Sequence, residues 1–237
     1  MPVLSETQTP FNQSFLPDQR RCVVPGFGID VASQRADALD EKALAFLASL
    51  REKSGGVSAL DLACGLGGQS RRMASLGVCV AAVDQQDQPT LSPDALACQG
   101  VPPSLRFVCA DMRHLPKDLP FAPYDAICCQ RALHYLPYPA ARSLLTSLKS
   151  IMKDHARLFV SVSGLPSELR HGYAHADLPV AERFAPLGAE MAARHGIGSS
   201  VCLYEAQDLV DLLHEAGYGV QDVGVSPFGN IKAVAFV

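Results

Sequence analysis

The chain has 237 residues, of which 48% are hydrophobic and 19% charged, with a net charge of −4 at pH 7. This composition predicts one globular domain with a substantial core, and the acidic balance excludes a general attraction to nucleic-acid phosphates. No apolar run approaches the roughly 20 residues that cross a bilayer, and the N-terminus does not read as a signal peptide, so we expect a cytoplasmic protein without a membrane partner.

The eight cysteines include no C-x-x-C pair, and several fall inside apolar runs. They are typical of small buried side chains that stay reduced. His171, His175 and Asp177 form a metal-like group, but Gly172 weakens a helix there and no third ligand is fixed by spacing. The sequence therefore predicts no metal site.

Residues 1–28 are rich in Pro, Gln and Thr without a sustained period, which predicts an irregular N-terminal extension in front of one domain over 29–237. Phe11, Phe15 and Phe27 are candidate anchors for it. From about 37 to 51, apolar residues recur at helical spacing with charged residues opposite, so an amphipathic helix precedes the first strand.

The stretch from Ala59 to Ser70 organises the chain. An apolar run over 59–63 predicts a buried strand, Gly65, Gly67 and Gly68 predict a turn, and 69–76 has helical spacing. Glycines let the backbone approach a ligand closely, and the helix start offers free N–H groups to it.

A second apolar run, over 78–83, closes on Asp84. A carboxylate at the end of the second strand is placed to accept hydrogen bonds from the two hydroxyls of a ribose. The sequence therefore predicts a nucleotide-like ligand lying over the first two strands.

The run Asp61-Leu-Ala-Cys-Gly-Leu-Gly67 resembles the first motif of the class I S-adenosylmethionine-dependent methyltransferases, acid-x-Gly-x-Gly-x-Gly, with Ala63 in place of the first glycine. The resemblance implies that Asp61 orients the turn or reaches the amino group of the cofactor. It also implies main-chain contacts and a ribose site, provided by Ala63, Cys64, Gly65, Gly67, Asp84 and Gln85.

The third predicted strand, 105–110, leads to Asp111 and Met112, and the fourth, 126–129, leads to Gln130. By the same resemblance, Asp111 and Met112 frame the adenine and Gln130 lies beside the sulfonium. Asp111 capping the following turn is the alternative.

A Leu-His pair follows the fourth strand, as in the resembled family, which makes His134 the candidate catalytic base or acceptor contact. A partly buried histidine satisfied by backbone is the alternative. No Asn-Pro-Pro-Tyr or Asp-Pro-Pro-Tyr follows this strand, which argues against methylation of nucleobase or glutamine amines.

The remaining pattern predicts a helix over 139–154, a strand over 157–162, a helix over 205–216 and a terminal hairpin of strands 218–225 and 231–237. Between them, 163–202 is irregular, polar and aromatic. A segment that leaves the carboxyl end of a strand starts at the ligand edge, so 163–202 is the candidate acceptor-binding insertion, with a plain surface excursion as the alternative.

The resemblance implies an α/β fold, a Rossmann-like seven-stranded sheet of order 3-2-1-4-5-7-6 with the last strand antiparallel and helices on both faces. It implies transfer of a methyl group from S-adenosylmethionine to an oxygen, nitrogen or carbon of a small organic molecule. The glycine turn alone would also suit a nicotinamide-dependent oxidoreductase, and the lack of an unmistakable base would suit a non-catalytic S-adenosylmethionine-binding protein. The oligomeric state is not fixed by the sequence.

Overall fold

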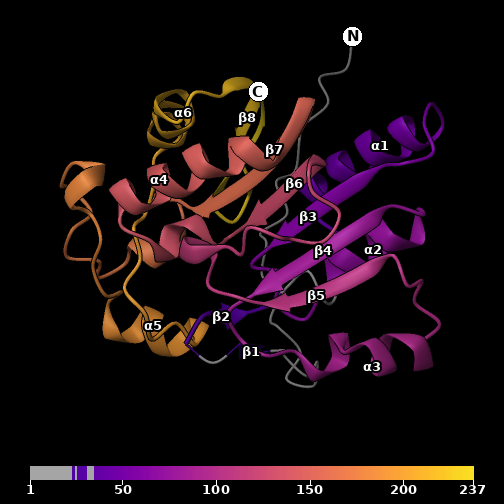
Figure 1. Cartoon of the computed structure of the whole chain (residues 1–237). Coiled ribbons are helices and arrows are strands. Elements are labelled where there is room, and N and C mark those ends of the chain that lie inside the picture. The colour runs from indigo at the N-terminus through magenta and orange to yellow at the C-terminus, as the bar shows by residue number, and fades with distance from the viewer. Residues whose placement is uncertain (1–22, 25, 31–34) are drawn as a thin grey trace, which may run out of the picture.

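The computed structural model describes residues 23–24, 26–30 and 35–237, and a seven-stranded sheet forms its centre (Figure 1). The strands are β1 Val23–Val24, β2 Gly28–Ile29, β3 Ser58–Leu62, β4 Cys79–Asp84, β5 Leu105–Cys109, β6 Tyr124–Gln130, β7 Met152–Ser163, β8 Gly219–Val225 and β9 Asn230–Phe236. The α-helices are α1 Ala38–Arg51, α2 Gly68–Ser75, α3 Pro93–Cys98, α4 Tyr138–Leu148, α5 Ala189–His195 and α6 Ala206–Glu215.

The large sheet has the order β5-β4-β3-β6-β7-β9-β8. Strands β3 to β7 pair in parallel, whereas β9 runs antiparallel to both of its neighbours. All five residues of β3 are buried, as expected for a parallel strand covered on both sides. The predicted order 3-2-1-4-5-7-6 with a reversed last strand is confirmed.

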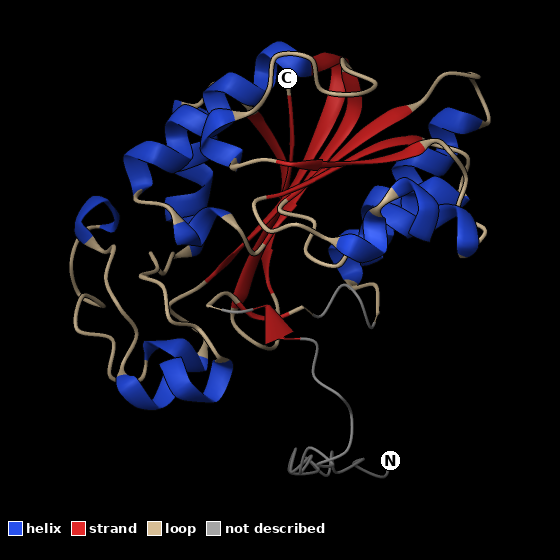
Figure 2. Cartoon of the chain, turned by 60° about the horizontal axis from the view of Figure 1, so that its bottom comes forward, coloured by secondary structure: helices blue, strands red, loops and turns tan. Residues whose placement is uncertain are grey.

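Helices cover the two faces of the sheet (Figure 2). Because successive strand residues point to opposite faces, Leu60 packs into the cluster formed with α4 and α6, and Ala59 packs into the cluster formed with α1, α2 and α3. Leu145 and Met73 are fully buried on these two faces. In the described part of the chain, no helix is long and apolar enough to cross a membrane.

Two sequence-based boundaries differ from the structure. The helix predicted to reach 154 ends at Leu148, and β7 already begins at Met152, which pairs with Tyr124 of β6. The apolar spacing continued across this junction and hid it. The extension was predicted to be irregular to residue 28, but β1 and β2 pair antiparallel in it. The sequence did not predict them because strands of two residues give no periodic signal. Phe11 and Phe15 lie outside the described residues.

Residues 163–202 form a compact unit beside the sheet, with α5 in it (Figure 1). The buried side chain of Arg183 connects this unit to α6. Its guanidinium donates to the carbonyls of Leu178 and Leu203 and pairs with Asp208 of α6 at 2.7 Å. The apolar residues of this unit form a core of their own with Leu203, made of Leu165, Leu169, Tyr173, Ala185, Leu187, Met191, Ile197 and Val201.

The turn between β3 and α2 is wound in the left-handed region. Gly65 and Gly67 have φ of +54° and +76°, and Ala63 has φ of +57°. The N–H of Cys64 donates to the carbonyl of Val83 at 3.0 Å, which joins the start of the turn to β4. Glycine adopts this conformation without a steric penalty, whereas an alanine there loses roughly 1–2 kcal/mol.

We expect Ala63→Gly to raise the free energy of unfolding by about 1 kcal/mol, because it removes that penalty. Urea denaturation of the two proteins is the measurement. Ala45→Gly is the control, since Ala45 is exposed in the middle of α1 and the same substitution there should destabilise by about 1 kcal/mol. A loss of stability in Ala63→Gly would contradict the left-handed strain at this position.

Candidate functional site

The carboxyl ends of adjacent parallel strands bring most of the predicted site residues to one edge. In the β3–β4 register Leu62 lies opposite Val83, so the glycine turn and Asp84 leave the sheet side by side. The N–H of Ala110 donates to the carbonyl of Asp84 at 2.8 Å, which places Asp111 next in line. Gln130 ends β6 on the other side of β3.

Asp84 holds the glycine turn directly. One of its carboxylate oxygens accepts from the N–H of Gly65 at 2.9 Å and the other from the N–H of Gln86 at 3.0 Å. The residue is 9% exposed, and this burial raises the pKa of the carboxyl. Each oxygen has two lone pairs, so acceptor capacity remains on both.

A second carboxylate, from Asp30, holds the next N–H of the turn. Asp30 accepts from the N–H of Leu66 at 2.8 Å, and a Cβ added at Gly65 would lie 2.7 Å from the same oxygen. The sequence analysis missed Asp30 because a single acid in a segment without periodicity gives no signal. The Cβ side of Gly67 faces Leu91, so Gly67 is required there by packing within the chain.

Residues 26–30, which we call the strap, connect three parts of the molecule. The carbonyl of Gly26 accepts from the N–H of Gly198 in the insertion at 3.1 Å. The carbonyl of Phe27 accepts from the Tyr135 hydroxyl at 2.6 Å, and the two rings meet edge to face at 5.0 Å. With Asp30 on the turn, the strap spans from the insertion to the candidate ligand site, and Phe27 is the anchor that the sequence suggested.

Two further acids are buried beside the turn. Asp61 accepts from the Ser70 hydroxyl of α2, and burial raises the pKa of Asp61 to about 7. Asp40 is only 2% exposed, although its helix was predicted to turn its charges to solvent. It accepts from the N–H of Asp37 in a capping box and from the side-chain amide of Gln130. Burial is also the main cause of the raised pKa of Asp40.

These acids act on one another. After burial, the charges of Asp40 and Asp30 further raise the pKa of Asp61, and Asp30 raises that of Asp84. A cation bound among them would relieve this repulsion. The negative charge of a pyrophosphate would add to this repulsion. In addition, the two turn N–H groups that would bind a phosphate already donate to carboxylates.

Asp111 adopts the capping geometry that was the alternative to adenine recognition. Its carboxylate accepts from the backbone N–H of Arg113 at 2.9 Å and forms an ion pair with the Arg113 guanidinium. These bonds, first of all those to the guanidinium, lower the pKa of Asp111. Met112 is half-buried and packs against the α4 side of the core. Gln85 is exposed, and its carbonyl lies 3.6 Å from the sulfur of Cys109.

His134 is 2% exposed, on a 3-10 turn that spans Leu133–Tyr135. Its ring nitrogens lie 3.4 Å from the backbone N–H and from the hydroxyl of Ser163, at the end of β7. Burial lowers the pKa of His134 to about 3, and the nearby charge of Arg131 adds to the effect. The ring is therefore a neutral, partnered group at physiological pH.

The polar residues of the insertion that were singled out in the sequence make contacts within it. Exposed His171 lies 3.7 Å from Glu190, and Asp177 pairs with Arg170 at 3.2 Å. Tyr173 is buried, and its hydroxyl donates to main-chain carbonyls of the unit.

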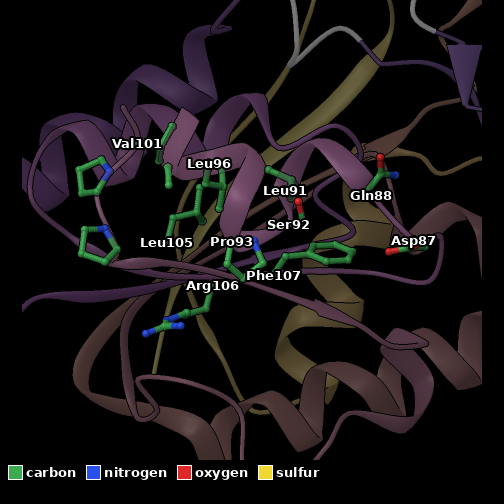
Figure 3. A pocket seen from close by; sticks show the side chains of 13 residues that line it. Asp87, Gln88, Leu91, Ser92, Pro93, Leu96, Val101, Leu105, Arg106 and Phe107 are labelled. Carbon is green, nitrogen blue, oxygen red and sulfur yellow. The ribbon is translucent and has the colours of Figure 1, made fainter. Parts of the chain in front are cut away.

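A separate cavity of about 460 Å³ lies between α3 and the edge strand β5 (Figure 3). Leu91, Leu96 and Phe107 line it, with Asp87 and Gln88 together at one end. Its lining contains none of the residues predicted to bind the cofactor, although Leu91 also faces Gly67 of the glycine turn.

Residues 59–155 match a family model described as a methyltransferase domain. A comparison with curated protein sequences gives no match. Among solved structures, the chain is similar to 1,6-didemethyltoxoflavin N1-methyltransferase from Burkholderia thailandensis, with a TM-score of 0.60 and 20% identity over 84% of this chain and 77% of that one.

Two other neighbours have the same fold. An S-adenosylmethionine-dependent methyltransferase from Clostridium acetobutylicum gives a TM-score of 0.60 with 14% identity over 87% of this chain and 94% of that one. Magnesium protoporphyrin IX methyltransferase from Synechocystis gives 0.55 with 18% identity over 83% and 80%. The family resemblance drawn from the motifs is thus confirmed: residues 59–155 match a methyltransferase domain, and the chain has the fold of the class I S-adenosylmethionine-dependent methyltransferases.

Proposed function

We propose that the chain binds S-adenosylmethionine at the glycine turn and transfers its methyl group to an oxygen, nitrogen or carbon atom of a small organic molecule. The observation that carries the proposal is the ring of buried acids around the turn, formed by Asp30, Asp40, Asp61 and Asp84. This set of acceptors fits a nucleoside that carries positive charge, and solved neighbours contain S-adenosylmethionine or S-adenosylhomocysteine.

The proposed roles follow from position. Asp84 and Gln85 hold the ribose, because both oxygens of Asp84 keep a lone pair beyond their backbone bonds. Asp61 fixes the start of α2 through Ser70. The main chain from Ala63 to Gly67, including Cys64 and Gly65, lies under the ligand, Met112 and Asp111 border the adenine, and Gln130 borders the sulfur.

When bound, S-adenosylmethionine supplies an activated methyl group whose transfer removes the positive charge of its sulfur. The chain's own contribution is to orient the two reactants and to exclude water, and orientation alone is worth roughly 7–11 kcal/mol. A base is needed only when the acceptor must lose a proton, so orientation and exclusion of water are sufficient for an acceptor that loses none.

We place the acceptor on the insertion side, over the ends of β6 and β7. The neighbours act, by their names, on 1,6-didemethyltoxoflavin and magnesium protoporphyrin IX, which supports a small organic acceptor. His134 borders this side as an acceptor contact. A pKa of about 3 makes His134 a weak proton acceptor. Its proposed role is therefore to contact the methyl acceptor through its neutral imidazole ring, and not to act as a base.

The two alternatives fare differently. A nicotinamide-dependent oxidoreductase requires a pyrophosphate on the turn, where Asp84 and Asp30 already occupy consecutive N–H groups. A non-catalytic S-adenosylmethionine-binding protein keeps every feature of the pocket. Binding without methyl transfer across a broad acceptor panel would favour it, and fluorescence of bound NADH would favour the oxidoreductase.

Calorimetric titration with S-adenosylmethionine and S-adenosylhomocysteine tests the proposal, and Asp84→Ala should weaken both by at least about tenfold, since a desolvated ribose pair loses its acceptor. Asp87→Ala is the matched control, an exposed acid on the same loop, and should change affinity less than twofold. No heat from either ligand with the folded wild type would sink the proposal, whereas unchanged affinity in Asp84→Ala would remove only the ribose assignment.

The buried Asp61 should make stability depend on pH. With a folded pKa of about 7 against 3.8 when unfolded, the folded state holds the proton more tightly, so the stabilisation present below pH 4 is lost as pH rises through 7. Asp61→Asn keeps an acceptor for Ser70 and cannot ionise. From pH 5 to pH 8, its free energy of unfolding should gain on the wild type by on the order of 2 kcal/mol in urea titrations. Parallel pH curves would refute the raised pKa.

His134 should remain neutral through the physiological range. Because its pKa is lowered to about 3 by burial, its ring Cε1–H signal in proton NMR should keep one position from pH 8 down to pH 5. The assignment is made by comparison with His134→Asn. A midpoint near 6.5 for this signal would show a solvated ring and restore His134 as a base working near neutral pH.

A further inference from the structure

The large sheet has two edge strands, β5 and β8, which differ in how they are protected. Natural proteins protect an edge with charged side chains, prolines or cover, because its unpaired main chain can bind another strand. β5 exposes Arg106 and directly follows a pair of prolines. β8 is exposed over residues 221–225, and its one charged side chain, Asp222, is paired with Lys42 of α1. The β8 edge is therefore the less protected of the two.

The main chain of Val223 and Val225 points to the free side of β8. The N–H of Ser226 donates to the carbonyl of Asn230 in the hairpin at 2.8 Å, so Ser226 faces β9. Because main-chain direction alternates along a strand, Gly224 also faces β9, whereas the residues on either side of it face away. Their N–H and C=O groups form the pattern of donors and acceptors that a further strand completes.

Exposed apolar side chains gather on the same hairpin. Val223 and Val225 lie opposite Ala233 and Ile231 of β9, on the face of the sheet that α6 covers, yet they are 39% and 49% exposed. Five of the seven large apolar side chains that are exposed in the described part of the chain lie on this hairpin or directly after it: Val223, Val225, Phe228, Phe236 and Val237. This concentration marks an interaction surface.

The sequence of the edge favours a second copy of the chain as the partner. The run Asp222-Val-Gly-Val-Ser226 has the same apolar residues on both sides of Gly224. When two copies pair antiparallel about a two-fold axis at Gly224, Val223 lies opposite the partner's Val225, and the two exchange main-chain hydrogen bonds. Asp222 then lies opposite the partner's Ser226, so like charges do not face each other across the axis.

We propose that the chain forms a homodimer in which the β8 strands of two copies pair antiparallel and join the two sheets into one. Val223 and Val225 of both copies form the apolar centre, and the turn 226–229 carries the exposed Phe228 toward the partner's Val220. This turn packs against the start of the insertion, since a Cβ added at Gly229 would meet the backbone of Ser167. The interface therefore adjoins the insertion of each copy.

Sedimentation velocity between about 1 and 100 µM tests the dimer, and the wild type should reach twice the mass of one chain within this range. Val225→Lys should raise the dissociation constant of the dimer by at least about tenfold, because it places a positive charge beside each valine pair. Leu76→Lys, at a side chain 37% exposed after α2, is the matched control and should leave the dimer intact. A wild type that stays monomeric, or a dimer that Val225→Lys leaves intact, would overturn the proposal.

A cysteine at the axis gives a second test that does not depend on weakening the interface. Facing residues of a non-hydrogen-bonded antiparallel pair have Cα atoms about 4.5 Å apart, which suits a disulfide. Nothing lies within 4 Å of a Cβ added at Gly224 or at Gly55, so a cysteine fits the monomer at either position.

With oxidised glutathione, Gly224→Cys should form a covalent dimer on non-reducing gels. Gly55→Cys carries the same native cysteines and should stay a monomer. Absence of the covalent dimer in Gly224→Cys, or equal amounts of it in the two variants, would show that the β8 strands do not meet at Gly224 and would overturn the proposed pairing.

Discussion

Two consecutive N–H groups of the glycine turn, those of Gly65 and Leu66, each donate to a buried carboxylate, and the site depends on this pair of bonds. Asp84 ties the turn to the end of β4, and Asp30 ties it to the strap. Backbone wound through the left-handed region has no ladder partners of its own, so these acceptors replace them. In the proposed function the same bonds favour a cation over a phosphate, because amides that already hold carboxylates are poor cradles for phosphate.

The negative charge of the buried carboxylates lowers the stability of the folded state. Burial raises the pKa of Asp40, Asp61 and Asp84, and their mutual repulsion adds to it. Each therefore has donors that keep it in place, such as the Ser70 hydroxyl on Asp61. In the proposed function a positively charged ligand offsets the remaining cost, so its binding also stabilises the folded state. Stability and affinity are in this way properties of the same few carboxylates.

The strands and helices with a regular hydrophobic pattern were predictable from the sequence, whereas contacts between residues far apart in the chain were not. Strand, turn and helix around Gly65 show in the apolar pattern, and so does the order of the strands through the family resemblance. Asp30 lies in a stretch without period, and Asp40 looks like a solvent-facing helix residue until Gln130 of β6 is brought against it. The hydrogen-bond partner of His134 is Ser163, which lies 29 residues away in the sequence, at the end of β7. Such long-range pairings leave no local trace.

Residues inside and outside the range that matches the methyltransferase domain have different proposed roles. The matched domain ends at residue 155, before the carboxyl end of β7 and before the insertion. The residues proposed to bind the cofactor therefore fall almost entirely inside it, whereas the strap and the core of the insertion fall outside. Tyr135 lies between the two: it is inside the matched domain, packs against the insertion core and donates to the strap. The neighbours at 14–20% identity share the fold alone, so in the proposed function we assign acceptor choice to these outlying segments, with Tyr135 as the residue through which they contact the matched domain.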